Sequence, residues 1–380
     1  MAMASGVYVE PLASLKSTGA IRPFSKAARI ALLCAFAYLP VCGPALAGTN
    51  IDITSLVGGV IIPNQAELEA AVQDKADLNG PIIADSFAMG NITGYPVGKA
   101  TIGTFPHFQV GVAMGAGMTN MRYFDDSRPE SDNGSFPGIT PNPVLHFGVG
   151  LGGGWDIIGK YFSLTKAIVD PELSTDIAKL SDYKLISLGA KVRYNIVKKK
   201  TLLPFIFNFG GVTVSLGGDF MYGDIKVTGE YEADFNDITV DYGSGSVPVP
   251  VGFDGDYQAR VLWSIFSLTA QAVAYFDVFY LFSFYTGFGL TGNYGYFKME
   301  FDGDGLLSSD DLGYIGSHPD GQVGTLLFES TNTYQPYYAI PTYLIGLEIN
   351  LWVLKVTGET MVNLYNRKDV NATVGVRVQI

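Results

Sequence analysis

The last stretch of the chain, residues 370–380, alternates between apolar side chains and polar or small ones. Apolar residues stand at every even position, and Arg377 and Gln379 stand at odd positions. Because side chains in a β-strand alternate between two faces, this pattern predicts a strand with one apolar face. An apolar face opposite Arg377 is typical of the wall of a membrane barrel, with lipid outside and polar groups inside.

The composition favours strands over helices as the membrane-crossing element. Of the 380 residues, 48% are hydrophobic and only 16% are charged, yet no run of eighteen apolar residues occurs after the first fifty. Helical membrane spans are therefore not expected. The counts of Gly (46), Tyr (22) and Phe (24) are typical of the close strand packing and aromatic girdles of a barrel. A soluble β-sandwich is the alternative.

The beginning of the chain resembles an export signal. The apolar run at residues 30–41 follows Arg22, Lys26 and Arg29, and precedes Ala45-Leu46-Ala47-Gly48, which has the small-residue spacing of a signal-peptidase site. This order predicts a signal peptide over residues 1–47, cleaved after Ala47, and hence a bacterial outer-membrane location.

Both cysteines, Cys34 and Cys42, lie within the predicted signal peptide, so the exported chain would have no disulfide. In the alternative, Cys42 becomes a lipidated N-terminal residue. Loss of four basic residues and one acidic residue with the signal would move the net charge from −12 to −15. Such a negative chain repels nucleic acid, so no nucleic-acid partner is expected.

Residues 48–104 differ from the rest of the chain. Asn64 is a candidate N-cap, residues 65–77 have helical composition, and Gly80-Pro81 is expected to end this short helix. A glycine-rich stretch without an expected strand ladder follows; its glycines are Gly90, Gly94, Gly98 and Gly103. These residues could form a plug in the lumen of a barrel, a periplasmic extension or a disordered leader.

Residues 105–380 are predicted to form the barrel. Segments with period-two patterning, separated by turn signals, predict ten strands at 108–123, 143–151, 155–164, 183–197, 205–222, 257–276, 280–299, 337–350, 353–365 and 370–380.

The connections between these strands mostly alternate between long and short, as expected for outer loops and periplasmic turns. The connection at residues 366–369 is the exception. An even number of strands is typical of bacterial barrels. Because residues 225–242 could add a hairpin, the prediction is an all-β transmembrane antiparallel barrel of 10 to 14 strands.

Apolar positions assigned to lipid leave charged side chains for the lumen. On the strand at 183–197, for example, Leu188 and Val192 face outward, and Lys191 and Arg193 face inward. The lumen-lining candidates are Lys160, Lys191, Arg193, Asp219, Glu348, Glu359 and Arg377. They could line a conducting path or bind a ligand head group, or they could form internal ion pairs that close the lumen.

The sequence contains no convincing catalytic or metal-binding motif. His107, His146 and His318 have no spacing typical of a metal site, and no nucleophile and base can be grouped, so no enzyme, metal or cofactor is expected. Asp302 and Asp304, with Asp310 and Asp311, lack the pattern of a calcium loop and are interpreted as a solvated acidic loop.

The chain has a characteristic order of a signal peptide, a glycine-rich segment, an opening strand at 105–112 (FPHFQVGV) and a hairpin at 152–156 (GGGWD). In this order it resembles outer-membrane barrels of spirochaetes, and among them the group assigned to the FadL long-chain fatty-acid transporter family. The resemblance implies a monomeric barrel plugged by its N-terminal segment, with Asn91, Gly94 and Gly98 as plug candidates. The chain departs from the family in having no Asn-Pro-Ala motif in this segment, and Asn91-Ile-Thr-Gly94 is only loosely similar to it.

Taken together, pattern and resemblance predict diffusion-type uptake of hydrophobic nutrients such as long-chain fatty acids. The expected partners are the outer-membrane bilayer, a hydrophobic small molecule and the outer-membrane assembly machinery, which would recognise Val376, Val378 and Ile380. The alternatives are a general porin, suggested by charges of both signs in the lumen, and a surface-exposed adhesin or structural barrel, suggested by acidic loops.

Overall fold

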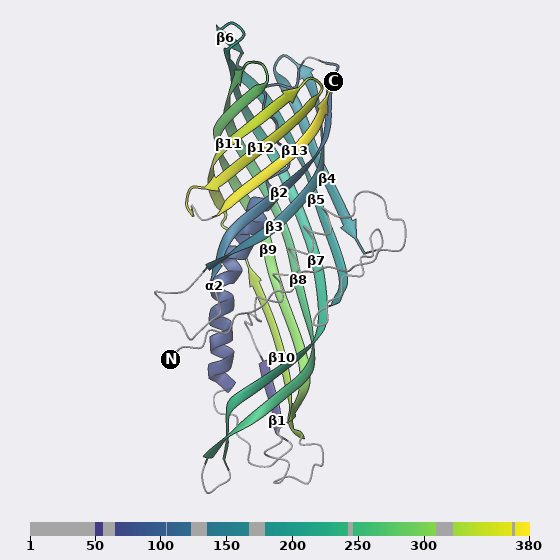
Figure 1. The fold of residues 1–380 in the computed structure, drawn as a ribbon, viewed down its shortest axis with the longest axis vertical. Helices are drawn as coiled ribbons and strands as arrows, with labels where there is room; N and C mark the ends of the chain where they lie inside the picture. The colour runs from purple at the N-terminus through teal and green to yellow at the C-terminus, as the bar shows by residue number, and fades with distance from the viewer. Residues whose placement is uncertain are drawn as a thin grey trace, which may run out of the picture.

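The computed structural model describes residues 50–55, 65–103, 105–122, 135–166, 179–241, 246–308, 322–366 and 369–380 (Figure 1). The predicted signal peptide at 1–47, with Cys34 and Cys42, lies outside these residues, as do His318, Asp310 and Asp311.

One helix and thirteen strands make up the described chain. In order they are β1 (Asn50–Ser55), α2 (Gln65–Asn91), β2 (His107–Arg122), β3 (Ser135–Gly152), β4 (Trp155–Thr165), β5 (Lys179–Val197), β6 (Lys200–Leu203), β7 (Phe207–Asp241), β8 (Ser246–Val278), β9 (Phe282–Ser308), β10 (Gln322–Tyr334), β11 (Ala339–Leu351), β12 (Leu354–Asn363) and β13 (Val370–Gln379).

Ten strands close into an antiparallel ring. The order is β9-β11-β12-β13-β2-β3-β4-β5-β7-β8, and β8 pairs with β9 again. The C-terminal strand closes the ring on the opening strand, from Val370 opposite Met118 to Gln379 opposite Gln109. The predicted all-β barrel is confirmed, and its strand number is ten, the lower end of the predicted range.

The two faces of the wall alternate as the sequence predicted. On β5, Leu188 and Val192 are exposed whereas Lys191 and Arg193 are buried. On β13, Val374 is exposed and Arg377 is buried. The apolar outer face is that of a barrel in lipid. In the described part of the chain, no helix combines the length and the apolarity needed to cross a bilayer.

The two ends of the barrel differ. The C-terminus and the tight turns lie at one end, here called the short-turn end, and long hairpins extend from the other, the long-hairpin end (Figure 1). A hairpin was expected as an option at residues 225–242, but residues 225–241 lengthen β7, which stays paired with β8 from Phe207 opposite Val278 to Asp241 opposite Ser246. Residue 242 lies outside the described residues.

Two further strands extend this end of the sheet, and neither was predicted. β10 continues along β9 beyond β11, and β1 pairs with β10. Asp302 and Asp304 are therefore in β9, paired on both sides, and not in a solvated loop. The interpretation failed because glycines alternate with these acids, and strand pairing overrode local turn propensity.

Helix α2 is longer than predicted, because it runs through Gly80-Pro81 to Asn91. Proline removes one helix hydrogen bond, but the residues that follow it pack inside the barrel, with Ala84 and Ala88 fully buried, and this packing outweighs the local stop signal. Gly80 is needed for close approach, since a Cβ there would lie 2.1 Å from the ring of Tyr334.

The second half of α2 and the residues after it, 79–103, are called the luminal segment. It enters the ring from the long-hairpin end, and residue 103 reaches β3 close to the short-turn end (Figure 1). Its polar contacts reach strands on every side of the ring, namely β3, β4, β5, β7, β8, β11 and β13. The barrel therefore encloses it.

Candidate functional site

The interior of the barrel is the candidate site, because most of the predicted polar residues meet the luminal segment there. Beyond Asn91 the segment is not helical, so its backbone N–H and C=O groups need partners outside the segment. Inward side chains of the wall supply many of these partners.

Lys160 on β4 and Asp219 on β7 form the central ion pair. Lys160 Nζ lies 2.8 Å from Asp219 Oδ1, and neither side chain is exposed. Asp219 also accepts the hydroxyl of Tyr95 at 2.5 Å. Lys160 donates to the carbonyls of Asn91 and Thr93, the latter at 2.9 Å. One ion pair thus joins two strands to the luminal segment.

Asn91 is the last residue of helix α2 and contacts β4, β7 and β8. Its amide nitrogen donates to Ser267 Oγ at 3.0 Å, and lies 3.2 Å and 3.3 Å from the carbonyls of Asp219 and Ile265. The side chain is fully buried. Asn91 therefore fastens the end of α2 to β7 and β8.

A second buried ion pair joins Arg377 on β13 to Glu348 on β11. Glu348 Oε2 accepts the N–H of Gly98 at 2.8 Å, and Arg377 NH1 donates to the carbonyl of Pro96 at 2.7 Å. The carboxylate of Glu348 therefore binds a backbone N–H, and the guanidinium of Arg377 binds a backbone carbonyl, within residues 96–98 of the luminal segment.

The predicted plug glycines lie where the segment touches the wall. A Cβ at Gly98 would lie 2.3 Å from Glu348 Cβ, and one at Gly94 would lie 2.4 Å from Val144 Cγ2. Gly94 also has φ +96°, a conformation that glycine adopts without a Cβ clash. Larger residues would push the segment away from the wall.

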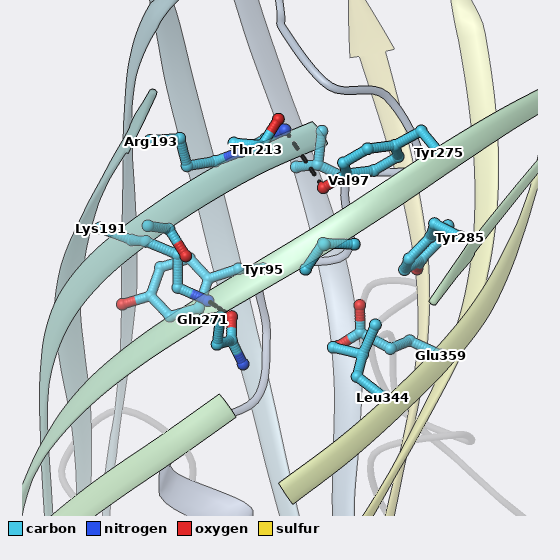
Figure 2. A pocket seen from close by; sticks show the side chains of 12 residues that line it. Tyr95, Val97, Lys191, Arg193, Thr213, Gln271, Tyr275, Tyr285, Leu344 and Glu359 are labelled. Atoms are coloured by element: carbon cyan, nitrogen blue, oxygen red, sulfur yellow. Dashed lines mark hydrogen bonds between the residues drawn. The ribbon is translucent and has the colours of Figure 1, made fainter. Parts of the chain in front are cut away.

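Lys191, Arg193 and Glu359 line a small cavity of about 30 Å³ (Figure 2). Lys191 Nζ donates to Gln271 at 3.0 Å and lies 4.5 Å from the centre of the Tyr95 ring. Glu359 and Tyr285 are on the other side of the cavity (Figure 2). The space is enough for one or two water molecules and not for a hydrocarbon chain.

Arg193 links this cavity to the luminal segment. Its NH2 group donates to the carbonyl of Lys99 and lies 3.4 Å from the hydroxyl of Tyr275. Six of the seven lumen-lining candidates are buried, and Glu359 is partly buried. Four of them form the two ion pairs, and the remaining three line the cavity.

The inner wall at the long-hairpin end is apolar. Phe87 of α2 packs between Trp263 and Phe297, with ring centroids 4.2 Å and 5.4 Å away. Around them lie buried apolar side chains of several strands and the helix: Ala84, Tyr183, Met221 and Ile225. This group, with Trp263 and Phe297, is called the apolar mouth.

Sequence reasoning missed several residues of the lumen. Asp156 on β4 accepts the N–H of Ile102 through both carboxylate oxygens, at 3.1 Å and 3.0 Å. Asp156 stands between Trp155 and Ile157, which face outward, so the alternation of side chains along a strand could have identified it as an inward residue. Tyr95 had no such signal, because it lies outside any strand.

Metal ligands are not grouped in the described residues, where no cluster of three or more His, Cys, Asp or Glu could hold an ion. His146 is buried on β3 inside the barrel, and His107 is exposed at the start of β2.

The closed ring, its apolar outer face and its occupied interior define a membrane β-barrel protein. The chain belongs to the Lsa36-like family, whose model matches residues 75–380. None of the curated proteins matches the chain.

The chain is also similar to solved barrels at low sequence identity. The attachment invasion locus protein Ail of Yersinia pestis is 11% identical, with 72% of this chain and 98% of that chain covered and a TM-score of 0.22. The translocator domain of the autotransporter NalP from Neisseria meningitidis is 11% identical, with 82% and 97% covered and a TM-score of 0.25. The toluene transporter TbuX of Ralstonia pickettii is 9% identical, with 86% and 96% covered and a TM-score of 0.23.

Proposed function

We propose that this protein works in the bacterial outer membrane as a closed barrel that admits hydrophobic small molecules, long-chain fatty acids among them, when the luminal segment moves. The proposal combines the barrel, its internal segment and the chemistry of the inner wall.

The apolar mouth is the observation that carries the proposal. The interior of a water-filled porin is polar. Here Trp263 and Phe297 face inward at the long-hairpin end, where a molecule from outside would arrive first, and Phe87 of the segment lies between them. These side chains are buried against the segment, so the surface attracts apolar molecules out of water once the segment moves.

The luminal segment is held in a way that permits movement. Below the apolar mouth, neutral wall side chains such as Asn142 and Gln379 donate hydrogen bonds to it, and Met89 and Ile92 add apolar packing. Charged side chains, among them Lys160, Glu348 and Arg377, make further hydrogen bonds to its backbone. A neutral hydrogen bond contributes about 0.5–1.5 kcal/mol net and one to a charged group about 1.5–3 kcal/mol, so movement of the segment requires these contacts to be exchanged one after another. The ring does not depend on the segment for its backbone hydrogen bonds, because neighbouring strands supply them.

Ligand quenching of tryptophan fluorescence tests the proposal. The chain has three tryptophans, and Trp155 and Trp352 lie on the outside of the barrel. In a Trp155→Phe, Trp352→Phe variant, Trp263 is the only emitter, and we expect a brominated long-chain fatty acid to quench it with saturation.

A variant that keeps only Trp352 is the matched control, since its emission reports fatty acid dissolved in the micelle or bilayer. Equal, unsaturated quenching of both variants would overturn the proposal. Planar-bilayer conductance provides a second measurement: the intact protein should be silent, and a version without residues 48–104 should conduct.

A general porin is less well supported, because four of the luminal charges are used in two ion pairs, Lys160–Asp219 and Arg377–Glu348. Steady ion current through the intact protein would favour it.

A surface role is the second candidate, favoured by the part of the sheet that extends beyond the ring. There β7, β8, β9, β10 and β1 continue as one sheet from the long-hairpin end (Figure 1). Strand edges can pair with an extended peptide. If this sheet binds a surface partner, a variant with the β7–β8 pair shortened to the ring should lose that binding and keep the barrel.

A further inference from the structure

A short hairpin projects from the barrel beyond the tight turns. β6 pairs with the beginning of β7, with Lys200 opposite Phe209 and Thr201 opposite Asn208, and it lies outside the ring. It forms the extreme tip of the short-turn end (Figure 1). Residues 198–206 are called the β6 finger.

The tip of the β6 finger is apolar on all sides. Leu202 and Leu203 are 55% and 56% exposed, Phe205 is 77% exposed, and Ile206 is 50% exposed. In a strand between lipid and water, exposed apolar residues would alternate with polar ones. Here neighbouring residues on both faces are apolar and exposed, a pattern that is unfavourable in water.

The backbone of this region is also unusual for turns in water. Phe205, Phe279 and Tyr280 have φ values of 65°, 52° and 56°. This left-handed region favours glycine, asparagine or aspartate and is unfavourable for other residues. The β3–β4 turn at the same end uses glycines, Gly153 and Gly154, in that region. Phe205, Phe279 and Tyr280 therefore occupy turn positions whose positive φ disfavours large side chains.

The β6 finger and the β8–β9 turn form one surface. The N–H of Phe279 donates to the carbonyl of Ile206 at 2.9 Å, and the rings of Phe205 and Tyr280 are 6.4 Å apart. Lys199 pairs with Asp277 at 2.6 Å, and its ammonium group lies over the Tyr280 ring. These contacts fix the two turns relative to each other.

The base of the β6 finger is basic. Lys198, Lys199 and Lys200 are consecutive and exposed, and the apolar outer face of β5 leads directly to them through Ile196, which is 52% exposed. The surface therefore continues the lipid-contacting wall and combines an apolar tip with cationic groups. Aromatic and cationic residues of this kind anchor proteins at a membrane interface.

The structure assigns the β6 finger and the β8–β9 turn a place in the interfacial layer of the adjacent phospholipid leaflet. The apolar tip lies among the lipid head groups, and Lys198 and Lys200, nearer the lipid-facing wall, bind anionic phosphates. Basic residues near an anionic membrane surface are attracted to it. This inference does not depend on the transport proposed above.

A fluorescent label at Phe205 tests the assignment. The chain has only Cys34 and Cys42, so replacing both by serine allows a single Phe205→Cys site to carry an environment-sensitive dye. The protein is refolded into vesicles of phosphatidylethanolamine and phosphatidylglycerol, with and without lipid bearing a nitroxide high on its acyl chain. We expect the nitroxide to reduce the emission at least twofold and aqueous iodide to have little effect.

Two matched sites calibrate this measurement. Val374→Cys lies on the lipid-facing wall, and Asp254→Cys is exposed on β8 beyond the ring. The label at Phe205 should behave like the label at Val374. Iodide quenching equal to that at Asp254, without nitroxide quenching, would overturn the assignment and leave the tip free for a protein partner.

The double variant Lys198→Gln, Lys200→Gln measures separately how much the lysine charges contribute to lipid binding by the β6 finger. In the parent protein, nitroxide quenching at Phe205 should increase with the share of phosphatidylglycerol, and the double variant should lose this increase. The same increase in the variant would overturn phosphate binding by these lysines. Leu203→Cys provides a second labelling site if Phe205→Cys fails to fold.

Discussion

Lys160 and Asp219, on strands separated by β5, form an ion pair of 2.8 Å inside the barrel, with both side chains fully buried. Asn91, Thr93 and Tyr95 of the luminal segment bind the same two residues. Lys160 and Asp219 therefore pair with each other across the wall and also hold the luminal segment in place.

Removal of one partner should be strongly destabilising. Asp219→Ala leaves Lys160 buried without its carboxylate, which costs about 3–5 kcal/mol for pairs of this kind. We expect urea unfolding of the vesicle-bound protein to show a loss of this size.

The double variant Lys160→Met, Asp219→Leu is the control for that experiment. It removes both charges and should be more stable than Asp219→Ala, because no unpaired ion-pair partner remains, but it should stay below the parent, because the Tyr95 hydroxyl and the carbonyls of Asn91 and Thr93 lose their partners. A single variant as stable as the parent would contradict the role given to the pair.

Gly98→Ala should displace the luminal segment. The added Cβ would lie 2.3 Å from Glu348 Cβ, and overpacking of this type costs about 1–3 kcal/mol. Trypsin cleavage after the partly buried Lys99, followed by mass spectrometry, should become faster.

Gly358→Ala on β12 is the matched control, because an added Cβ there meets nothing within 4 Å. Its cleavage rate after Lys99 should equal that of the parent. If both variants are cleaved equally, the contact with Glu348 does not hold the segment.

Val374→Arg tests the outer face. Val374 lies midway along β13 and is 60% exposed, whereas Arg377 on the same strand is buried inside. An arginine at the middle of the lipid face costs about 2–4 kcal/mol. Val374→Ile should cost less than about 1.5 kcal/mol. Similar unfolding free energies for both variants would show that this face does not contact lipid.

Asp85 on α2 gives a pH prediction, and it lies outside the spanning strands. Burial raises the pKa of its carboxyl to about 7, the N–H of Tyr337 at 2.7 Å lowers it, and the charge of Asp369 raises it. The folded state therefore holds this proton to a higher pH than the unfolded state does. Stability should fall as pH rises from about 4 to about 7, by at most about 1.4 kcal/mol per pH unit.

Asp85→Asn removes this titration and keeps an oxygen for the Tyr337 N–H. Its unfolding free energy should equal or exceed that of the parent above about pH 7, and its advantage should shrink as the pH falls. A constant difference across the range would show that Asp85 does not titrate with folding.

Much of the barrel was predictable from the sequence. Each of the ten predicted strands overlaps one strand of the ring, with ends that differ by up to two residues where the prediction runs past the observed strand, and the assigned faces of β5 and β13 agree with the exposed and buried residues. The reason is that the two-residue repeat is local, and the penalty for a charge in lipid fixes which face points outward.

Only the tertiary structure decided how far the sheet and the helix extend and what fills the ring. α2 continues through Pro81, and β10 and β1 lengthen the sheet, because packing and pairing with distant residues outweighed local turn signals. The contacts of Asn91, Tyr95 and Gly98 likewise depend on wall residues far away in the chain. The sequence by itself determined the two faces of the wall, whereas the register around the closed ring decided which inward side chains meet the luminal segment.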